Sequence, residues 1–410
     1  MTVGTNWARH YEYRASVLHT PRTIEELQDV VSRTPRIRAL GSRHSFHDLA
    51  DSAELVSLEG LPPEVRIDGE SETVSFSGGV RYGELAPVLA EAGWALRNLA
   101  SLPHISAAGA VATGTHGSGN GNGTLSRAVT GLDIVTASGE IVTISPADAD
   151  FDGAVVSLGS LGVVSRITLD IEPTFEVRQD VYEGLTWTNL LENLDAIMAR
   201  AYSVSVFTQW QGEDVGRVWL KSVTGERRPP QTLYGATPAL GARHPIHGMS
   251  TEATTQQSGV PGPWLDRLPH FRMDHTPSVG NELQTEYIVP RAHGVDAVAA
   301  IRGLSDRITP HLHISELRSM AADSLWLSGA YDTDALAIHF TWKNEPDAVL
   351  PLLELIEETL APFAARPHWG KLFHAVDRSS YPRLADFVAL ADRMDPAGKF
   401  RNDFVNTHVF

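Results

Sequence analysis

Two pairs of polar residues stand out because each pair is spaced two apart within an otherwise apolar run. Glu316 and Arg318 form one pair, and His339 and Thr341 form the other. Both runs are predicted strands, in which residues two apart point to the same face. A cation beside a hydroxyl oxygen stabilises the alkoxide that forms when the hydroxyl loses its proton. The competing interpretation of Glu316 and Arg318 is a solvated ion pair on an exposed strand.

Lys371 is the third feature that could do chemistry, because it follows Trp369 and Gly370 in an aromatic setting. Burial or a neighbouring cation lowers the pKa of a lysine and allows it to act as a base. Arg318 and Lys371 are therefore candidates for polarising or deprotonating a reacting hydroxyl group.

Two further segments, 40–46 and 101–119, concentrate glycine and small polar residues. Glycine lets the main chain approach a ligand closely, and consecutive free N–H groups form a concave anion site. This composition suits the pyrophosphate of a dinucleotide, although plain surface turns are the alternative. The sequence contains neither G-x-G-x-x-G nor G-x-x-x-x-G-K-[ST], so a Rossmann site and a P-loop are not expected.

The segment LGSRHSF (40–46) resembles the pyrophosphate loop of the vanillyl-alcohol-oxidase flavoprotein family. ASLPHISAAGAVATGTHGSG (100–119) is similar to that family's second FAD-contacting stretch, and SLGSLGVV (157–164) to the segment that closes over the cofactor. RPHWGK (366–371) resembles the branch of sugar-alcohol (alditol) and aldonolactone oxidases. The likeness extends over nearly the whole chain, from residue 6 to residue 400.

The resemblance implies a bound FAD that is covalently attached through His44. Some relatives tether FAD through both a histidine and a cysteine, but this chain has no cysteine, so His44 is the one candidate link. The residues that we expect to contact the cofactor are His44, Gly41, Ser42, Arg43, Ser45, Ser101, Ser106, Gly109, Gly114, Thr115, His116, Gly117 and Val164.

The resemblance also implies a substrate pocket and roles for its residues. Arg318 and Lys371 would polarise or deprotonate the reacting hydroxyl, and Glu316 would accept from nearby hydroxyls and hold Arg318. Ser101 and Thr341 would bind the polyol chain, with His339 as a weaker candidate. A small residue before Ser101, Ala100, would leave room for O₂ beside the flavin. The expected catalytic set is Arg318, Lys371 and Glu316, and the expected substrate-binding set is Ser101, Glu316, Arg318, Thr341 and Lys371.

The reaction implied by the resemblance is oxidation of a polyol by O₂ to the aldose and hydrogen peroxide, with xylitol and sorbitol as the leading substrates. The near alternative is an aldonolactone oxidase or dehydrogenase. A non-catalytic carbohydrate-binding protein and a metallohydrolase are alternatives from other classes. No metal site is expected, because the histidine pairs 44/47 and 244/247 lie in loop-like sequence without a carboxylate that completes a ligand set.

The helix and strand signals along the chain predict an α+β fold with two domains, which would position these residues. Residues 1–172 mix helix and strand signals and are expected to form the FAD-binding domain. Residues 173–371 carry several predicted strands and are expected to form a substrate domain with an antiparallel sheet. The segment 372–410 is expected to return to the FAD-binding domain as short elements joined by turns, and 222–283, rich in Pro, Gly and Gln, as surface loops.

Within these domains, local signals predict individual elements. Thr23 and Glu26 form a capping box, with Glu26 expected to reach back to the N–H of Thr23. A helix is predicted near 82–92, a hairpin over 132–144 with its turn at Ser138 and Gly139, and a second helix over 347–360.

Composition narrows the class of partner. The chain of 410 residues carries a formal net charge of −17, so nucleic acids and anionic membranes are not expected to bind it. The absence of cysteine fits a reducing compartment, and the N-terminal residues do not resemble a secretory signal. We therefore expect a cytoplasmic enzyme whose partners are a small polyol and O₂.

Overall fold

In the computed structural model, which describes residues 3–226, 229–275 and 281–410, helix α1 (Ile24–Arg33) begins directly after Thr23. The hydroxyl of Thr23 accepts a hydrogen bond from the N–H of Glu26, as the capping box predicts. The second half of that prediction is wrong, because the carboxylate of Glu26 accepts from the N–H of Arg22, one residue earlier than expected. Helix α1 still starts at the predicted residue, because one bond to a first-turn N–H is sufficient to cap it.

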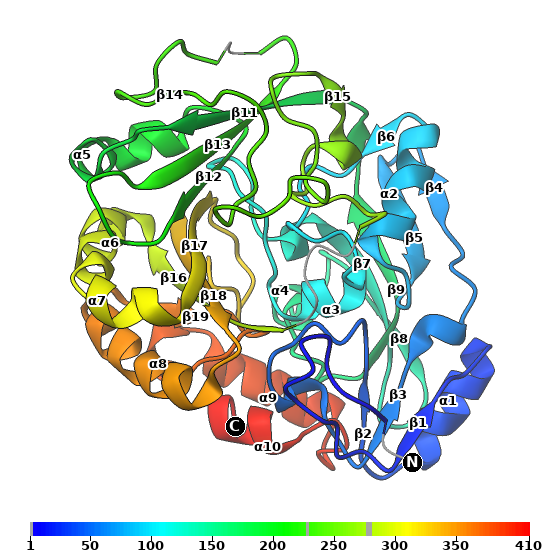
Figure 1. The fold of residues 1–410 in the computed structure, drawn as a ribbon. Helices are drawn as coiled ribbons and strands as arrows, with labels where there is room; N and C mark the ends of the chain where they lie inside the picture. The colour runs from blue at the N-terminus through cyan, green and yellow to red at the C-terminus, as the bar shows by residue number, and fades with distance from the viewer. Residues whose placement is uncertain (1–2, 227–228, 276–280) are drawn as a thin grey trace.

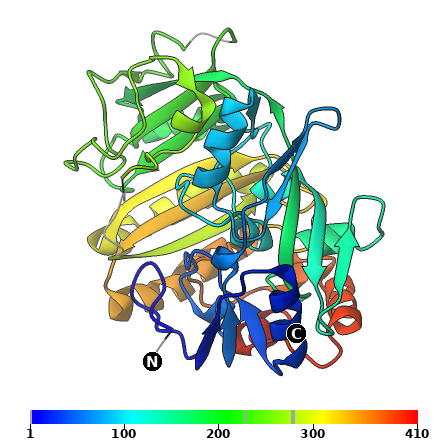
Figure 2. The same ribbon diagram turned by 90° about the vertical axis from the view of Figure 1, so that its right-hand side faces the viewer.

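The N-terminal part of the chain is built on two larger sheets (Figures 1 and 2). A parallel sheet has the order β1-β3-β2, and an antiparallel sheet has the order β4-β5-β9-β7-β8. The hairpin predicted over 132–144 is the pair β7 and β8, and Gly139 takes a φ of 87° at its turn. The strands are β1 (Val17–His19), β2 (Ile37–Ala39), β3 (Glu54–Val56), β4 (Arg66–Asp68), β5 (Thr73–Ser77), β7 (Val129–Val135), β8 (Ile141–Ile144) and β9 (Val163–Asp170). Helices α2 (Tyr82–Glu91), α3 (Ala107–Ala112) and α4 (Phe151–Val155) lie between them, and β6 (Trp94–Ala95) pairs with β10 (Glu172–Pro173).

The second domain is built on a large sheet in the order β14-β11-β13-β12-β17-β18-β16-β19, with β15 beside β11. Helices α5, α6 and α8 cover one face of it, and their apolar residues share a core with β12, β16 and β18 (Figure 1). The strands are β11 (Glu176–Glu183), β12 (Ser203–Thr208), β13 (Gly216–Val223), β14 (Thr237–Pro238), β15 (Gly262–Pro263), β16 (Glu282–Pro290), β17 (Leu312–Met320), β18 (Ala335–Lys343) and β19 (Arg366–Pro367). The helices are α5 (Trp187–Met198), α6 (Gly294–Arg302), α7 (Ser305–Ile308) and α8 (Pro346–Leu360).

Strands β16, β17 and β18 alternate between apolar and polar residues, and this alternation defines the two faces of the large sheet. Leu283 on β16, Leu317 on β17 and Ile338 on β18 pack into the helix-covered core. Their neighbours in sequence project from the opposite face, because successive side chains of a strand alternate. The opposite face is the one that carries the predicted polar residues.

The C-terminal segment packs against the first domain. Phe387 of α9 (Leu384–Met394) and Phe404 of α10 (Asp403–His408) belong to the same core as Phe76 of β5 and Ile167 of β9. The expectation of only short elements after residue 372 is wrong, because α9 is an 11-residue helix with a buried apolar face. The proposed domain boundaries at 172 and 371 stay predictions. In the part of the chain that the structure describes, no helix has the length and hydropathy needed to cross a membrane.

Candidate active site

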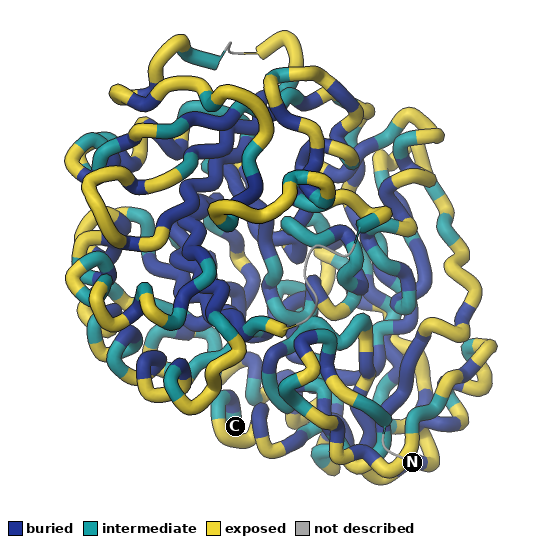
Figure 3. The backbone as a smooth tube through the Cα atoms, in the orientation of Figure 1, coloured by how far each residue is buried: buried dark blue, intermediate teal, exposed yellow. Residues whose placement is uncertain are grey.

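A cavity of about 310 Å³ is lined by residues of both domains. One wall comes from the glycine-rich loops of the first domain, and the other comes from the polar face of the large sheet. Residues in the interior of the molecule are mostly buried or half-buried, whereas exposed residues concentrate at the periphery (Figure 3). The cavity therefore brings together the two sets of residues that the sequence singled out separately.

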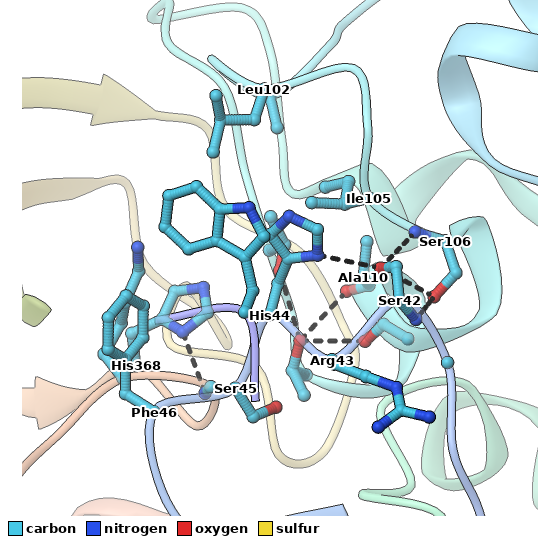
Figure 4. Close-up of a pocket in the computed structure, with 18 of the residues that line it drawn as sticks. Ser42, Arg43, His44, Ser45, Phe46, Leu102, Ile105, Ser106, Ala110 and His368 are labelled. Atoms are coloured by element: carbon cyan, nitrogen blue, oxygen red, sulfur yellow. Dashed lines mark hydrogen bonds between the residues drawn. The ribbon is translucent and has the colours of Figure 1, made fainter. Parts of the chain in front are cut away.

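The loops 41–46 and 101–106 are held together by hydrogen bonds in both directions. The N–H of Ser106 donates to Oγ of Ser42 at 2.8 Å, and the N–H of Ser42 donates to Oγ of Ser106 at 3.3 Å (Figure 4). A Cβ placed on Gly41 would lie 2.4 Å from Oγ of Ser106. Glycine at position 41 is therefore required for the close approach of the two loops.

The backbone of the first loop is shaped to receive an anion. Arg43 takes a left-handed φ of 63°, which turns the chain between Ser42 and His44. No described residue accepts a hydrogen bond from the backbone N–H groups of Arg43, His44 or Ser45. Consecutive free N–H groups at such a turn form a concave site for phosphate oxygens. The Cβ atoms missing from Gly78 and Gly162 would also overlap neighbouring backbone at 2.1 and 2.5 Å, so glycine lets other parts of this wall pack closely.

His44 projects into the cavity from this loop (Figure 4). Its Nδ1 lies 3.0 Å from Oγ of Ser42, and its ring stacks on Trp7 with a centroid separation of 5.3 Å. Within the described residues its buried Nε2 has no hydrogen-bond partner. Burial lowers the pKa of His44 to about 4, so the imidazole is neutral at physiological pH and its ring nitrogens can act as nucleophiles.

The opposite wall is formed by aligned residues on three neighbouring strands. Glu286 of β16 pairs across the sheet with His339 of β18, and His339 pairs with Glu316 of β17. In the next row, Gln284 of β16 pairs with Thr341 of β18. Glu316 and Arg318 are 6% and 7% exposed, so the alternative of a solvated surface pair is wrong. The loops of the first domain and the loop that carries His270 cover this face of the sheet, which the local sequence does not indicate.

Arg318 is the centre of a buried charge network. Its Nη2 donates to Oε1 of Glu286 at 2.5 Å, and its Nε lies 3.7 Å from Oε1 of Glu316. Burial alone would raise the pKa of Glu286 and of Glu316. The nearby positive charge of Arg318 instead holds the pKa of both carboxyls below the usual range. His116 contributes to this effect at Glu286, and His270 contributes to it at Glu316. Both glutamates are therefore ionised, and Arg318 is held as a cation at the cavity wall.

Lys371 reaches the same wall from the segment after β19. Its Nζ donates a short hydrogen bond to Oε1 of Gln284 and lies 5.5 Å from the ring centroid of Phe46. Burial lowers the pKa of Lys371 to about 8. Because the N–H of Phe46 donates to the carbonyl of Gly370 at 3.0 Å, the lysine is tied to the loop that carries His44.

Most residues expected at the site line this one cavity. They are Gly41, Ser42, Arg43, His44, Ser45, Ala100, Ser101, Ser106, Gly109, Thr115, His116, Val164, Glu316, Arg318, His339, Thr341 and Lys371. Gly114 and Gly117 are the exceptions among the expected set. Gly114 turns the chain after α3 with a φ of 63°, and a Cβ on Gly117 would lie 2.2 Å from Oδ1 of Asn98. Their roles as cofactor contacts stay predictions.

The structure also places at the cavity residues that were not predicted from the sequence. Gln284 and Glu286 show the same spacing of two as Glu316 and Arg318, so the same argument could have found them. His244, His270 and Phe271 come from the region predicted to be surface loops, which folds back over the large sheet. Residues 227–228 and 276–280 of that region lie outside the described residues. No local signal identifies a loop residue that reaches a distant sheet.

These features fit a bound FAD. The turn at Arg43 offers unpaired N–H groups to a pyrophosphate, the glycines allow close approach, and His44 presents a neutral ring to the cavity. Within the described residues, no three metal-binding side chains are grouped so as to hold a metal ion. The free N–H groups, the glycines and His44 are together the features that fit a dinucleotide.

Comparisons with known sequences agree with this geometry. A family described as "FAD binding domain" matches residues 15–145, and one described as "D-arabinono-1,4-lactone oxidase" matches residues 279–408. The chain is 48% identical over 98% of its length to an alditol oxidase from a Streptomyces species, of which 98% is covered. It is 30% identical over 98% of its length to the L-gulono-1,4-lactone dehydrogenase of Mycobacterium tuberculosis, again with 98% of that chain covered.

Among solved structures, the cholesterol oxidase of B. sterolicum shares the fold. It matches with a TM-score of 0.82 at 14% sequence identity, covering 100% of this chain and 97% of that one. This likeness supports the two-domain arrangement of an FAD-binding domain and a second domain with an antiparallel sheet. The chain belongs to the alditol oxidase group of the vanillyl-alcohol-oxidase family of FAD-dependent oxidoreductases.

Proposed function

We propose that this protein is an alditol oxidase that oxidises the terminal primary alcohol of a polyol to the aldose and converts O₂ to hydrogen peroxide. FAD, when bound, would supply the acceptor for the hydride and the means of reducing O₂. The observation that carries the proposal is the placement of Arg318 and Lys371 on the cavity wall that faces the His44 loop. A hydroxyl placed there meets both a fixed cation and a lysine of lowered pKa.

Arg318 and Lys371 have different roles in removing the hydroxyl proton. Arg318, held by Glu286, stays charged and stabilises the negative charge that develops on the alcohol oxygen. Lys371 has a pKa of about 8, so a substantial fraction is neutral near that pH and can accept the proton. The pair therefore supports loss of the hydroxyl proton as the hydride leaves the same carbon.

The remaining polar residues would bind the polyol chain. Glu316 offers a carboxylate acceptor, while Ser101 and Thr341 offer hydroxyl groups that both donate and accept. His339 is the weaker candidate. Its Nε2 lies 3.3 Å from Oε1 of Gln284, the oxygen that also accepts from Lys371. A row of such groups matches a substrate that carries a hydroxyl on every carbon.

The cofactor would be held by the loops of the first domain. His44 would form a covalent bond to the flavin through its neutral ring, and the N–H groups of residues 43–45 would bind the pyrophosphate. Ala100 lines the cavity beside Ser101, and its small side chain would leave room for O₂. We further propose that residues 1–172 and 372–410 form the FAD-binding domain and 173–371 the substrate domain, and that the enzyme acts in the cytoplasm.

The test is a comparison of substrates on the purified flavoprotein. Xylitol and sorbitol should be oxidised with one hydrogen peroxide formed per aldose. The match of residues 279–408 to a lactone oxidase family makes an aldonolactone oxidase or dehydrogenase the second candidate. Faster turnover of an aldonolactone than of either polyol would favour that candidate, and activity with a dye but without peroxide would make it a dehydrogenase.

A further inference from the structure

Lys221 of β13 is a buried lysine that the proposed reaction does not use. It is 1% exposed, and its Nζ contacts three acceptors supplied by one turn of the loop over the sheet. Nζ donates to the carbonyl of Leu268, to the carbonyl of Pro269 at 3.1 Å, and contacts Nδ1 of His270 at 2.9 Å. The two carbonyls can only accept from Nζ, and the ammonium form has a third N–H for Nδ1 of His270. Burial lowers the pKa of Lys221 to about 7, so the ammonium and amine forms are both populated near neutral pH.

This arrangement fixes the tautomer of His270. Nδ1 accepts from the ammonium form of Lys221, and the ionised carboxylate of Glu316 at 2.8 Å can only accept from Nε2, so the single proton of the neutral ring is on Nε2. Burial, followed by the charge of Lys221, lowers the pKa of His270 to about 4, which keeps the ring neutral. The ring is also held edge-on against Phe207 and Trp219, with centroid separations of 5.5 and 5.2 Å.

The proton on Nε2 of His270 points at the substrate site. Nε2 lies 2.8 Å from Oε1 of Glu316, and Nε of Arg318 lies on the same oxygen at 3.7 Å. No described residue donates a hydrogen bond to Oε2 of Glu316, and Glu316 lines the cavity. One carboxylate oxygen is therefore held by the protein, and the other is free for a substrate hydroxyl.

We propose that Lys221 is a positioning residue for substrate binding, which acts through the tautomer of His270 to aim the carboxylate of Glu316 at a polyol hydroxyl. The inference rests on the proposed function for the identity of the substrate, but the tautomer itself does not depend on that function. Lys221 also ties the 268–270 turn to β13, so it sets the position of the loop that contributes His270 and Phe271 to the cavity.

The first test is Lys221→Met, which keeps the length of the side chain and removes all three donors. We expect KM for the polyol to rise about tenfold while kcat changes much less, because Glu316 would bind hydroxyls away from the reacting carbon.

Lys399→Met is the matched control. Lys399 is also buried, and its Nζ donates to three backbone carbonyls, those of Val31, Ser32 and Ala137. None of these residues lines the cavity. Lys399→Met should cause a comparable loss of stability without a change in KM.

A double-mutant cycle tests whether Lys221 acts through His270. In a His270→Ala background, Lys221→Met should change KM by less than about twofold, because the ring that transmits the effect is gone. An undiminished effect in that background would overturn the proposal, as would a Lys221→Met enzyme whose KM matches that of Lys399→Met.

The tautomer can be read without turnover, by NMR of the FAD-loaded protein with ¹⁵N-labelled histidine, with His270 assigned by comparison with His270→Ala. The wild type should show a protonated Nε2 and an unprotonated Nδ1, and Lys221→Met should show a mixture. A protonated Nδ1 in the wild type would overturn the proposal even if Lys221→Met fails to fold. If the wild type shows the expected tautomer but oxidises no polyol, the proposed function fails while the positioning of Glu316 stands.

Discussion

Arg318 and Glu286 form a buried ion pair in the cavity wall, with Nη2 of the arginine 2.5 Å from Oε1 of the glutamate. Glu286 is 1% exposed, and the same oxygen lies 3.2 Å from Nε2 of His116. One carboxylate of the sheet thus holds both the cation proposed to bind the alkoxide and a histidine from the FAD-binding domain. Glu286 is therefore a point of contact between the two domains.

Glu286→Gln should lower both stability and activity. Loss of the carboxylate leaves Arg318 buried with less compensation, and breaking a buried pair costs about 3 kcal/mol of unfolding free energy. Chemical denaturation followed by tryptophan fluorescence measures this change. Asp195→Asn is the control, because Asp195 pairs with Arg291 at 2.7 Å but its side chain is 73% exposed. Its effect should stay below about 1 kcal/mol, and equal losses in the two variants would contradict the account of the buried network.

Lys371→Met should lower kcat by a factor of about 10² to 10⁴, the usual contribution of a general base, and should leave FAD bound. Steady-state kinetics combined with the flavin absorbance measures both quantities. Lys343→Met is a suitable control, since Lys343 donates to the carbonyl of Pro310 at 2.6 Å, away from the cavity. Unchanged turnover in Lys371→Met would remove this residue from the mechanism.

The pH dependence of kcat/KM should follow the protonation of Lys371. A base acts in its neutral form, so kcat/KM should rise by about tenfold per pH unit below the pKa of about 8 and level off above it. The profile of kcat/KM reports the pKa of the base in the enzyme without substrate. A profile that falls between pH 7 and 9 would contradict the assignment.

The elements of the site were predictable where a local pattern decides the structure. The spacing of Glu316 and Arg318 correctly predicted that they share one face of a strand, and Thr23 correctly predicted where α1 starts. Burial was not predictable, because Glu316 and Arg318 are covered by the opposite domain and by the loop that carries His270, which lie far away in sequence. The contact between Lys221 and the 268–270 turn could not be predicted for the same reason, because these residues come together only in the folded protein.

Gly41→Ala should reduce the amount of FAD that the protein incorporates. The added Cβ would lie 2.4 Å from Oγ of Ser106, so the serine must move and its hydrogen bonds with Ser42 must weaken. The ratio of flavin to protein absorbance measures the FAD content, which we expect to fall several-fold. Such a fall corresponds to a loss of about 1 kcal/mol or more in the free energy of FAD binding. Gly121→Ala is the control, because its Cβ would have nothing within 4 Å and its flavin content should be that of the wild type.

The glycine-rich loops show a second limit of prediction from sequence. Composition indicated an anion site in both segments, and the structure places Gly41 and Gly109 on the cavity but Gly114 and Gly117 off it. A glycine that packs against Asn98 cannot be told from one that faces a ligand without knowing which loop lies opposite.

Acid precipitation of the purified protein tests the central claim most directly, because it separates bound from covalently attached flavin. We predict that the yellow colour stays with the precipitate, that the intact chain carries the mass of one FAD, and that His44→Ala releases its flavin to the supernatant. Release of the flavin from the wild type would contradict the His44 bond. A protein that stays colourless after incubation with FAD would contradict the flavoenzyme altogether.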